Sequence, residues 1–340
     1  MRWRGETIED VGLRASGQIT RVPGNPKPSL RVSFTKYRKD RHVHGLAGFK
    51  LDAMGRDPSM LRERLAYGLY RDAGMPAPRE VHARVTVNGE LKGLYAVEER
   101  VGTKFLKKHF GTPVRQLYYW TGQVDDLDWL GSNPALYVPD LLKHRDRTLP
   151  MGGKDIAELV DAVKNKDIAA AGRIFDVENF LRHLAVEALT GETDGFIGVS
   201  TREETKHIWS SNFFLYKNPK TEKFQTLIWD RDQSFWRPVG TGATAGFSEH
   251  MFTRRLILDR PENLKRYREI LRGLLDGPAA PDRLVARLDA IFSEIKAAAL
   301  EDPNKMVPAN DAYLSSVREL RTYIRTYLTA LSADVARPGP

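Results

Sequence analysis

The stretch that decides the fold reads DVENFLRHLAVEALTGETDGF at 176–196 and, after a polar insertion, SSNFFLYKNPKTEKFQTLIWDRDQSFW at 210–236. Apolar residues recur at helical spacing after Asp176, so the first segment predicts a helix with Asp176 as its N-cap. Gly191 ends the pattern and leaves Asp194 on a loop just beyond the helix. Loops held by packed elements are where functional side chains are commonly found.

The second segment predicts a β-hairpin with strands at 212–216 and 224–229 around an Asn-Pro turn. A turn centred near Lys220 would pair residue 212 with residue 228. Asn212 and Asp230 would then lie diagonally on one face of the sheet. Together with Asp194 they offer two carboxylates and an amide, which suits Mg²⁺.

These residues resemble the motifs of the CotH family, the spore-coat-type atypical protein kinases. Asp-Gly-aromatic stands at 194–196, Asn-Phe-aromatic-Leu-Tyr at 212–216 and Trp-Asp-x-Asp at 229–232. The resemblance implies a protein-kinase-like, two-lobe α+β fold that uses ATP and Mg²⁺ to phosphorylate Ser or Thr of a protein. Asp194 would be the catalytic residue, and Asn212 and Asp230 would hold the metal.

The insertion between the motifs departs from ordinary kinases, in which the catalytic Asp and the metal-binding Asn are close in sequence. Here 18 positions separate Asp194 from Asn212, and residues 197–211 lie between the motifs. Two interpretations stay open: the insertion forms a substrate-binding loop, or it displaces Asn212 from the site.

The first hundred residues predict a small antiparallel sheet with one helix, the plan of a kinase N-lobe. Asn88-Gly89 is a strong hairpin turn signal. The remainder predicts a mainly helical lobe that carries the 210–236 hairpin. We therefore expect an N-lobe at 1–100, a C-lobe at 101–334 and a disordered tail at 335–340. Strands are predicted at 11–15, 30–34, 46–52, 81–87 and 91–97, and helices at 59–72, 103–110, 154–166, 264–275, 281–300 and 309–328.

Four side chains of the first lobe are candidates for nucleotide binding. By analogy with the family, Lys50 on a strand and Glu63 on the next helix form the ion pair that positions phosphates. Lys27 competes with Lys50 for that role, since its Lys-Pro-Ser context also matches the family. Glu98 either bonds the ribose or, with Glu99, caps the following helix. An ordinary surface role for Lys50 and Glu63 stays open.

The composition of the chain limits the kinds of chemistry and binding partner that we expect. The chain has 340 residues, a formal net charge of +9 and no cysteine, which excludes disulfides and thiol chemistry. The charge favours anionic partners, but no run of Lys and Arg marks a nucleic-acid surface. No apolar run is long enough to span a bilayer, and no leader-like segment opens the sequence. Location stays open, with an exported or spore-surface site suggested by the resemblance.

Two further functions remain as alternatives to a protein kinase. A kinase-like fold can support another nucleotide-dependent transfer, since fold does not fix the reaction. The chain is alternatively a non-catalytic pseudokinase or partner-binding module.

Overall fold

A computed structural model describes residues 1–17, 19–111, 116–121, 127–137, 153–165, 167–199 and 208–337. The fold is α+β, as predicted, with small antiparallel sheets and helices. The chain divides into two compact units. Unit 1 comprises 1–64, 78–113 and 287–320, and unit 2 comprises 65–77, 114–286 and 321–340. The units are therefore interleaved along the chain, whereas the sequence suggested consecutive segments that meet at residue 100.

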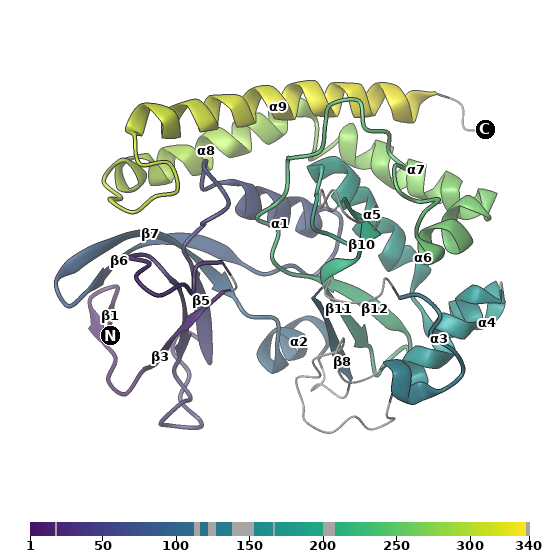
Figure 1. Ribbon diagram of the computed structural model, residues 1–340, viewed down its shortest axis with the longest axis horizontal. Helices are drawn as coiled ribbons and strands as arrows, with labels where there is room; N and C mark the ends of the chain where they lie inside the picture. Colours follow the sequence, from purple (N-terminus) through teal and green to yellow (C-terminus); the bar gives the residue numbers. More distant parts are fainter. Residues whose placement is uncertain are drawn as a thin grey trace. The chain divides into compact units, whose positions relative to one another are not determined.

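Unit 1 is built on a five-stranded antiparallel sheet (Figure 1). Asn88 and Gly89 both have positive φ, at 52° and 85°, which confirms the predicted tight hairpin turn. One face of the sheet packs a core that includes Val32, Phe49 and Tyr95. The strands in spatial order are β3 (Gly12–Ser16), β4 (Ser29–Ser33), β5 (Gly48–Asp52), β7 (Glu90–Glu99) and β6 (Glu80–Val87), and a separate hairpin pairs β1 (Arg2–Trp3) with β2 (Glu6–Thr7).

Helix α1 (Arg62–Asp72) begins three residues after the predicted start at Ser59. The Asp57 carboxylate explains the delay, because it accepts hydrogen bonds from the backbone N–H groups of Ser59, Leu61 and Arg62 at 2.7–2.8 Å. It therefore acts as the capping group of the helix from a position further upstream.

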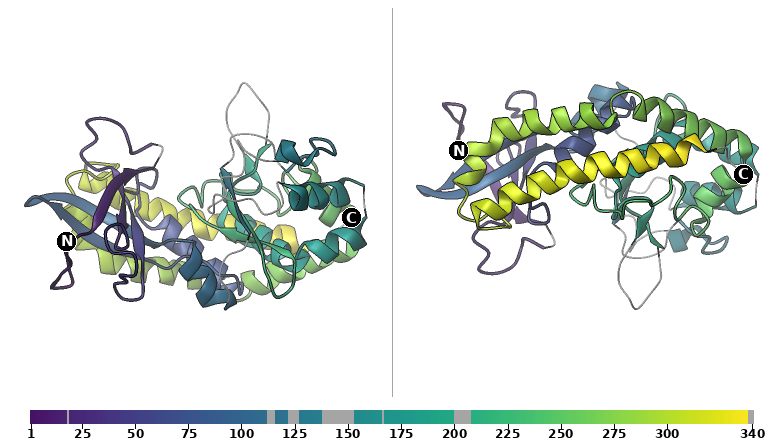
Figure 2. Two further views of the ribbon diagram at one scale, coloured as in Figure 1. Left: turned by 90° about the horizontal axis from the view of Figure 1, so that it is seen from below. Right: turned by 90° about the horizontal axis from the view of Figure 1, so that it is seen from above.

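Helices α8 (Pro281–Leu300) and α9 (Asn310–Ala336) lie side by side in both views that show them (Figures 1 and 2). Their connection contacts the sheet of unit 1 through Asp302, whose carboxylate accepts from the N–H of Leu94 at 2.9 Å and pairs with Lys27 at 2.7 Å. A Cβ on Gly93 would lie 2.6 Å from Oδ2 of Asp302, so only glycine permits this approach. The residues in contact are far apart in the sequence, which is why this packing of the connection against the sheet was not predicted.

Unit 2 contains a three-stranded antiparallel sheet in the order β12 (Phe224–Ile228), β11 (Ser211–Lys217), β8 (Leu117–Thr121). The hairpin of β11 and β12 confirms the prediction, whereas β8 was not predicted. The other elements of this part of the chain are α2 (Thr103–Phe110) in unit 1, and in unit 2 η1 (Pro134–Tyr137), α3 (Lys154–Lys164), α4 (Ile168–Ile174), α5 (Val177–Thr190), β9 (Gly198–Val199), β10 (Ile208–Trp209), α6 (Met251–Thr253), η2 (Arg254–Leu258) and α7 (Pro261–Leu275).

Helix α5 is capped as predicted. The carboxylate of Asp176 accepts from the N–H of Asn179 at 3.0 Å, and Gly191 closes the helix with φ 54°. His183, in the middle of this helix, is fully buried. From His183 to Thr190 every residue of the helix is buried.

The register predicted for the hairpin is wrong by one residue. Phe213, and not Asn212, pairs with Ile228. Asn212 has φ 57°, and the pairing of β11 with β8 shifts at this position. A bulge therefore replaces the regular alternation on which the prediction relied.

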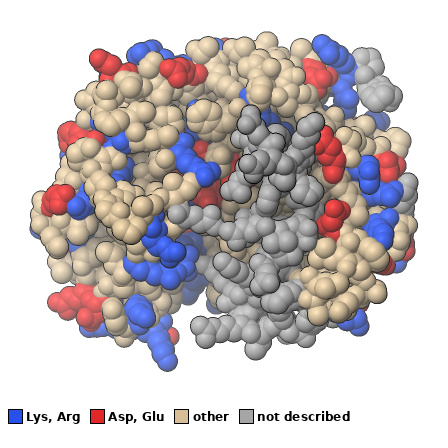
Figure 3. All heavy atoms as spheres, viewed as in Figure 1, with Lys and Arg blue, Asp and Glu red and all other residues tan. Residues whose placement is uncertain are grey.

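The predicted disordered tail begins too early, because α9 continues through Ala336. Residues 338–340 lie outside the described part of the chain. None of the described helices is both long enough and apolar enough to cross a membrane. Basic and acidic side chains are interspersed on the face drawn in Figure 3.

Candidate active site

Asp194 and Asn212 are in direct contact in unit 2. Nδ2 of Asn212 donates to Oδ2 of Asp194 at 2.9 Å and to its carbonyl oxygen at 3.0 Å. Nε2 of Gln233 donates to the same carboxylate oxygen at 2.8 Å. Two amide donors thus fix the orientation of the Asp194 carboxylate.

The insertion leaves this contact intact. Strands β9 and β10 pair at its two ends, with Val199 opposite Ile208 and Gly198 opposite Trp209. The chain therefore departs and returns at adjacent positions, and the interpretation that the insertion displaces Asn212 is wrong. Residues 200–207 lie outside the described part of the chain.

Asp230 is held beside Asn212 by its neighbours. The carbonyl oxygen of Asn212 accepts from the N–H of Trp229 at 3.3 Å and from Nη2 of Arg231 at 2.9 Å. The N–H of Asp230 donates to the hydroxyl of Tyr67 at 3.0 Å. Asp230 is half-buried and has φ 54°, so the chain turns immediately after β12. The structure thus brings the three motif residues into one neighbourhood, despite the wrong register.

A buried ion pair supports the loop that carries Asp194. Arg231 is fully buried, and its Nη1 donates to Oε1 of Glu187 at 3.0 Å. Glu187 also accepts from Nε2 of His183 at 3.0 Å and from the N–H groups of Phe196 and Ile197 at 2.7 and 3.2 Å. Burial raises the pKa of Glu187, but the charges and hydrogen bonds of His183 and Arg231 outweigh it and lower the pKa to about 2.

Gly195 is required by this ion pair. An added Cβ would lie 2.6 Å from Cδ of Glu187 and 2.7 Å from Nη1 of Arg231, much closer than atoms approach. The glycine of the Asp-Gly-Phe motif therefore lets the loop close over the charged pair. Glu192 fixes the other side of the loop, since it accepts from the N–H of Asp194 at 2.9 Å and from the hydroxyl of Ser234 at 2.7 Å.

Glu187 and Arg231 were not among the site residues predicted from the sequence. Two signals were available in the sequence: a His and a Glu four residues apart in the predicted helix, and an Arg between the two Asp residues of the Trp-Asp-x-Asp motif. Neither pattern reveals the partner, because 44 positions separate Glu187 from Arg231.

The donor set fits Mg²⁺, which accepts one or two carboxylates together with substrate phosphates. Within the described part of the chain, Oδ1 of Asn212 takes part in no hydrogen bond, so it is available as a ligand. No group of three His, Cys, Asp or Glu suited to a metal occurs among the described residues. The predicted protein ligands are one carboxylate, that of Asp230, and the amide oxygen of Asn212, and the nucleotide would supply further ligands.

Lys50 and Glu98 are brought together in unit 1. Nζ of Lys50 lies 2.8 Å from Asp52 and 3.3 Å from Glu98. Burial raises the pKa of Asp52, but Lys50 and several hydrogen bonds outweigh it and the pKa is lowered. Asp52 was not predicted as a member of this cluster, although it lies two residues after Lys50 on the same face of β5.

Glu63 lies beside the same cluster. Burial raises the pKa of Glu98 well above its ordinary value, and the charge of Glu63 raises it further. The pKa of Glu80 is raised for the same two reasons. The expectation that Glu98 or Glu99 caps the next helix is wrong, because α2 has no side-chain cap and Glu99 forms a two-bond pair with Arg79 at 2.8 Å.

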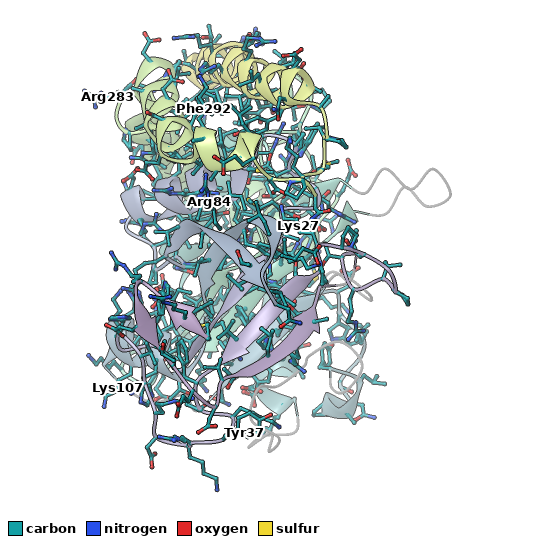
Figure 4. All side chains as sticks on the ribbon, turned by 90° about the vertical axis from the view of Figure 1, so that its left-hand side faces the viewer. Lys27, Tyr37, Arg84, Lys107, Arg283 and Phe292 are labelled. Atoms are coloured by element: carbon teal, nitrogen blue, oxygen red, sulfur yellow. The ribbon has the colours of Figure 1, made fainter. Side chains whose placement is uncertain are left out.

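Lys27 forms its ion pair with a different carboxylate from those that hold Lys50. Its ammonium group is 3% exposed and pairs with the buried Asp302, which is fully enclosed. Figure 4 shows Lys27 between the strands of the sheet and the paired helices α8 and α9. The buried pair with Asp302 gives Lys27 a structural role. Lys50 is therefore the better candidate for contact with phosphate.

Comparison with known proteins places the chain in a family. The model of the CotH kinase protein family matches residues 13–331, and the chain belongs to this family. Inner spore coat protein H of Bacillus subtilis (strain 168) is 26% identical over 301 residues, which cover 82% of this chain and 75% of that protein.

Two fungal proteins from Rhizopus delemar match a smaller part of the chain. Invasin CotH7 is 25% identical over 160 residues, and spore coat protein homolog 1 is 24% identical over 153 residues. The alignments cover 46% and 44% of this chain but only 27% and 25% of the fungal proteins. The family is thus established, and the matched region spans about a quarter of the length of these fungal proteins.

Proposed function

We propose that the protein is an atypical protein kinase that transfers the γ-phosphoryl group of ATP to a Ser or Thr hydroxyl of a protein, with Mg²⁺ as cofactor. The observation that carries the proposal is the contact between Asp194 and Asn212 at 2.9 Å, made across an insertion that separates them by 18 positions. Membership of the CotH kinase protein family supports it. The two compact units would correspond to the lobes of a kinase-like fold.

In this proposal Asp194 orients the acceptor hydroxyl and takes its proton. The amides of Asn212 and Gln233 hold one carboxylate oxygen in place, so the carboxylate is positioned before the substrate binds. Asn212, through Oδ1, and Asp230 would hold the metal. Magnesium, when bound, would neutralise charge on the phosphates.

Unit 1 would supply Lys50 as a cation for the phosphates, with Glu63 and Glu98 beside it. Asp52 and Glu98 already hold the ammonium group, which limits its rotamers before a nucleotide binds. Such preorganisation reduces the entropy cost of binding.

Labelled nucleotides test the proposal. The protein is incubated with Mg²⁺, an acceptor protein and ATP labelled on either the γ- or the α-phosphate. We expect the acceptor protein to become labelled only from ATP that carries the label on its γ-phosphate. Mass spectrometry should then locate the phosphate on Ser or Thr. Asp194→Asn should abolish transfer while the thermal shift produced by Mg²⁺ and ATP persists. Asp161→Asn, an exposed substitution on α3, is the matched control.

The alternatives give different results. Label from the α-phosphate indicates nucleotidyl transfer by the same fold. A pseudokinase or partner-binding module transfers no label, and its biological role survives Asp194→Asn. We also propose a spore-surface location, because the bacterial relative is named as an inner spore coat protein. Absence of the protein from extracts of the host's spore surface would contradict that location.

A further inference from the structure

One short segment, 210–212, binds the backbone of the loop that carries Asp194. The loop presents three consecutive carbonyl oxygens to this segment, beginning with that of Asp194. Nδ2 of Asn212 donates to the first at 3.0 Å, the N–H of Ser211 to the second at 2.8 Å, and the hydroxyl of Ser210 to the third at 2.7 Å. Each residue of the segment therefore holds one carbonyl group of the loop.

The hydroxyl of Ser210 is itself held by the imidazole of His250. Its oxygen lies 2.8 Å from Nε2 of the ring. Nδ1 of the same ring accepts from the N–H of Phe252 at 3.2 Å, so the proton of the neutral ring is on Nε2. The ring therefore donates to Ser210, which donates its own hydrogen to the carbonyl oxygen of Phe196. The two bonds form a directed chain from the imidazole to the loop.

This chain of hydrogen bonds is enclosed by protein. Ser210 is 1% exposed and His250 is 2% exposed. The imidazole also packs against the ring of Phe196, with the two ring centroids 4.7 Å apart. Loss of one partner of a buried hydrogen bond leaves the other polar group without a replacement from water. The position of Phe196 therefore depends on both side chains.

The chain acts close to the contact between Asp194 and Asn212. Ser210 precedes Asn212 by two residues, and Phe196 follows Asp194 by two residues. The bond from Ser210 to Phe196 thus ties together the two segments that carry the predicted catalytic carboxylate and the predicted metal ligand. If this tie opened, the segments could move relative to each other.

We propose that Ser210 and His250 are positioning residues that hold the Asp194 carboxylate in place beside Asn212. The inference rests on the proposed function and deepens it. Both side chains are buried, so they act through the backbone of the loop. A displacement of a catalytic group by about 1 Å can lower a rate about 100-fold, so a small loosening of the loop is measurable.

Steady-state kinetics of phosphoryl transfer tests the role of the hydroxyl in the full chain. Ser210→Ala should lower kcat roughly tenfold, because the loop is held less firmly. Its Kd for ATP with Mg²⁺, measured by calorimetry, should stay within about twofold of the wild type. Ser316→Ala is the matched control, since its buried hydroxyl also donates to backbone carbonyl groups, at 2.7 and 2.9 Å. The control should keep the wild-type kcat.

Two substitutions of His250 separate positioning from a local structural role. The amide of Gln reaches the place of Nε2 and can donate to Ser210, whereas the shorter amide of Asn reaches only the place of Nδ1 and can accept from Phe252. His250→Gln should therefore retain more of kcat than His250→Asn. The opposite order would show that the bond to Phe252 is the one that matters, and it would contradict the proposal.

Amide hydrogen exchange measures the loop without any substrate. Mass spectrometry follows the exchange of residues 192–197 in the wild type, Ser210→Ala and Ser316→Ala. Ser210→Ala should speed exchange in this segment about fivefold, as expected for the loss of one hydrogen bond. Ser316→Ala should leave the segment unchanged.

Three results would overturn the inference while the wild type transfers phosphate. One is an unchanged kcat in Ser210→Ala. Another is faster exchange at 192–197 without a decrease in kcat, which would make the contact purely structural. The third is an equal loss of kcat in Ser316→Ala, which would assign the effect to general stability. If the wild type itself transferred no phosphate, the proposed function would fail and this inference with it.

Discussion

The buried pair of Glu187 and Arg231 gives the sharpest prediction about stability. Glu187→Gln keeps the shape of the side chain and one of its two acceptor oxygens; in the wild type Oε1 accepts from the N–H of Phe196 and Oε2 from that of Ile197. It removes the negative charge that faces Arg231 at 3.0 Å, where both side chains are at most 2% exposed. The guanidinium group would then be buried beside a neutral amide.

The magnitude follows from the cost of an uncompensated buried charge. Removing one partner of a buried pair destabilises a protein by about 3–5 kcal/mol. For a domain of this size, that corresponds to a decrease in Tm of roughly 6–20 °C. Glu178→Gln on the same helix is the matched control, because its pairs with Arg182 and Arg266 are about 40% exposed. Such exposed pairs contribute only about 0–1 kcal/mol.

The assay is urea denaturation of four proteins: the wild type, Glu187→Gln, Arg231→Met and the double variant. We expect each single change to be strongly destabilising and the double variant to recover part of the loss, since no charge is then left unpaired. The reasoning is refuted if Glu187→Gln is no less stable than Glu178→Gln. It is equally refuted if the two single effects simply add.

Three further predictions follow from buried groups. Gly195→Ala should destabilise the protein by about 1–3 kcal/mol, because the new methyl group overlaps Glu187, and calorimetric unfolding measures this. Asp302→Asn should lower the free energy of unfolding by about 3 kcal/mol, because Lys27 stays buried without its carboxylate partner. In the same urea denaturation assay, Glu301→Gln, which breaks the exposed pair with Arg84, should lower it by less than about 1 kcal/mol. The folded-state pKa of Glu187 is lowered to about 2 from its ordinary 4.5, so its contribution to stability is complete above pH 4.5 and is lost as the pH falls toward 2. Glu187→Gln should flatten this part of a curve of unfolding free energy against pH.

Local patterns predicted the elements because they report on backbone preferences. The caps Asp176 and Gly191 and the Asn88-Gly89 turn all act through hydrogen bonds or φ values within a few residues. The hairpin of β11 and β12 was predicted for the same reason. Its register was not, because the left-handed backbone at Asn212 depends on contacts made by other parts of the chain.

Only the residues of the site that belong to the sequence motifs were predicted. Asp194 and Asn212 do meet, but the supports that bring them together come from residues distant in sequence. Arg231 occupies the variable position of the Trp-Asp-x-Asp motif, and it is fully buried in contact with Glu187 and Asn212. A solitary buried charge cannot be recognised from sequence until its partner is known.

The role of Lys27 shows the same limit. Its Lys-Pro-Ser context suggested contact with phosphate, but the ammonium group pairs with Asp302, 275 positions away. The sequence offered two lysines for one function. In the structure the two lysines differ in their ion-pair partners. Lys50 pairs with Asp52 and Glu98, whereas Lys27 pairs with Asp302.

The most direct measurement is a crystal structure of the protein with Mg²⁺ and a non-hydrolysable ATP analogue. The account predicts a metal ion about 2.1 Å from Oδ1 of Asn212 and from a carboxylate oxygen of Asp230, with further ligands from the phosphates. Asp194 should lie beside the terminal phosphate without coordinating the ion. A metal bound elsewhere, or a nucleotide that touches neither Asn212 nor Asp230, would contradict it.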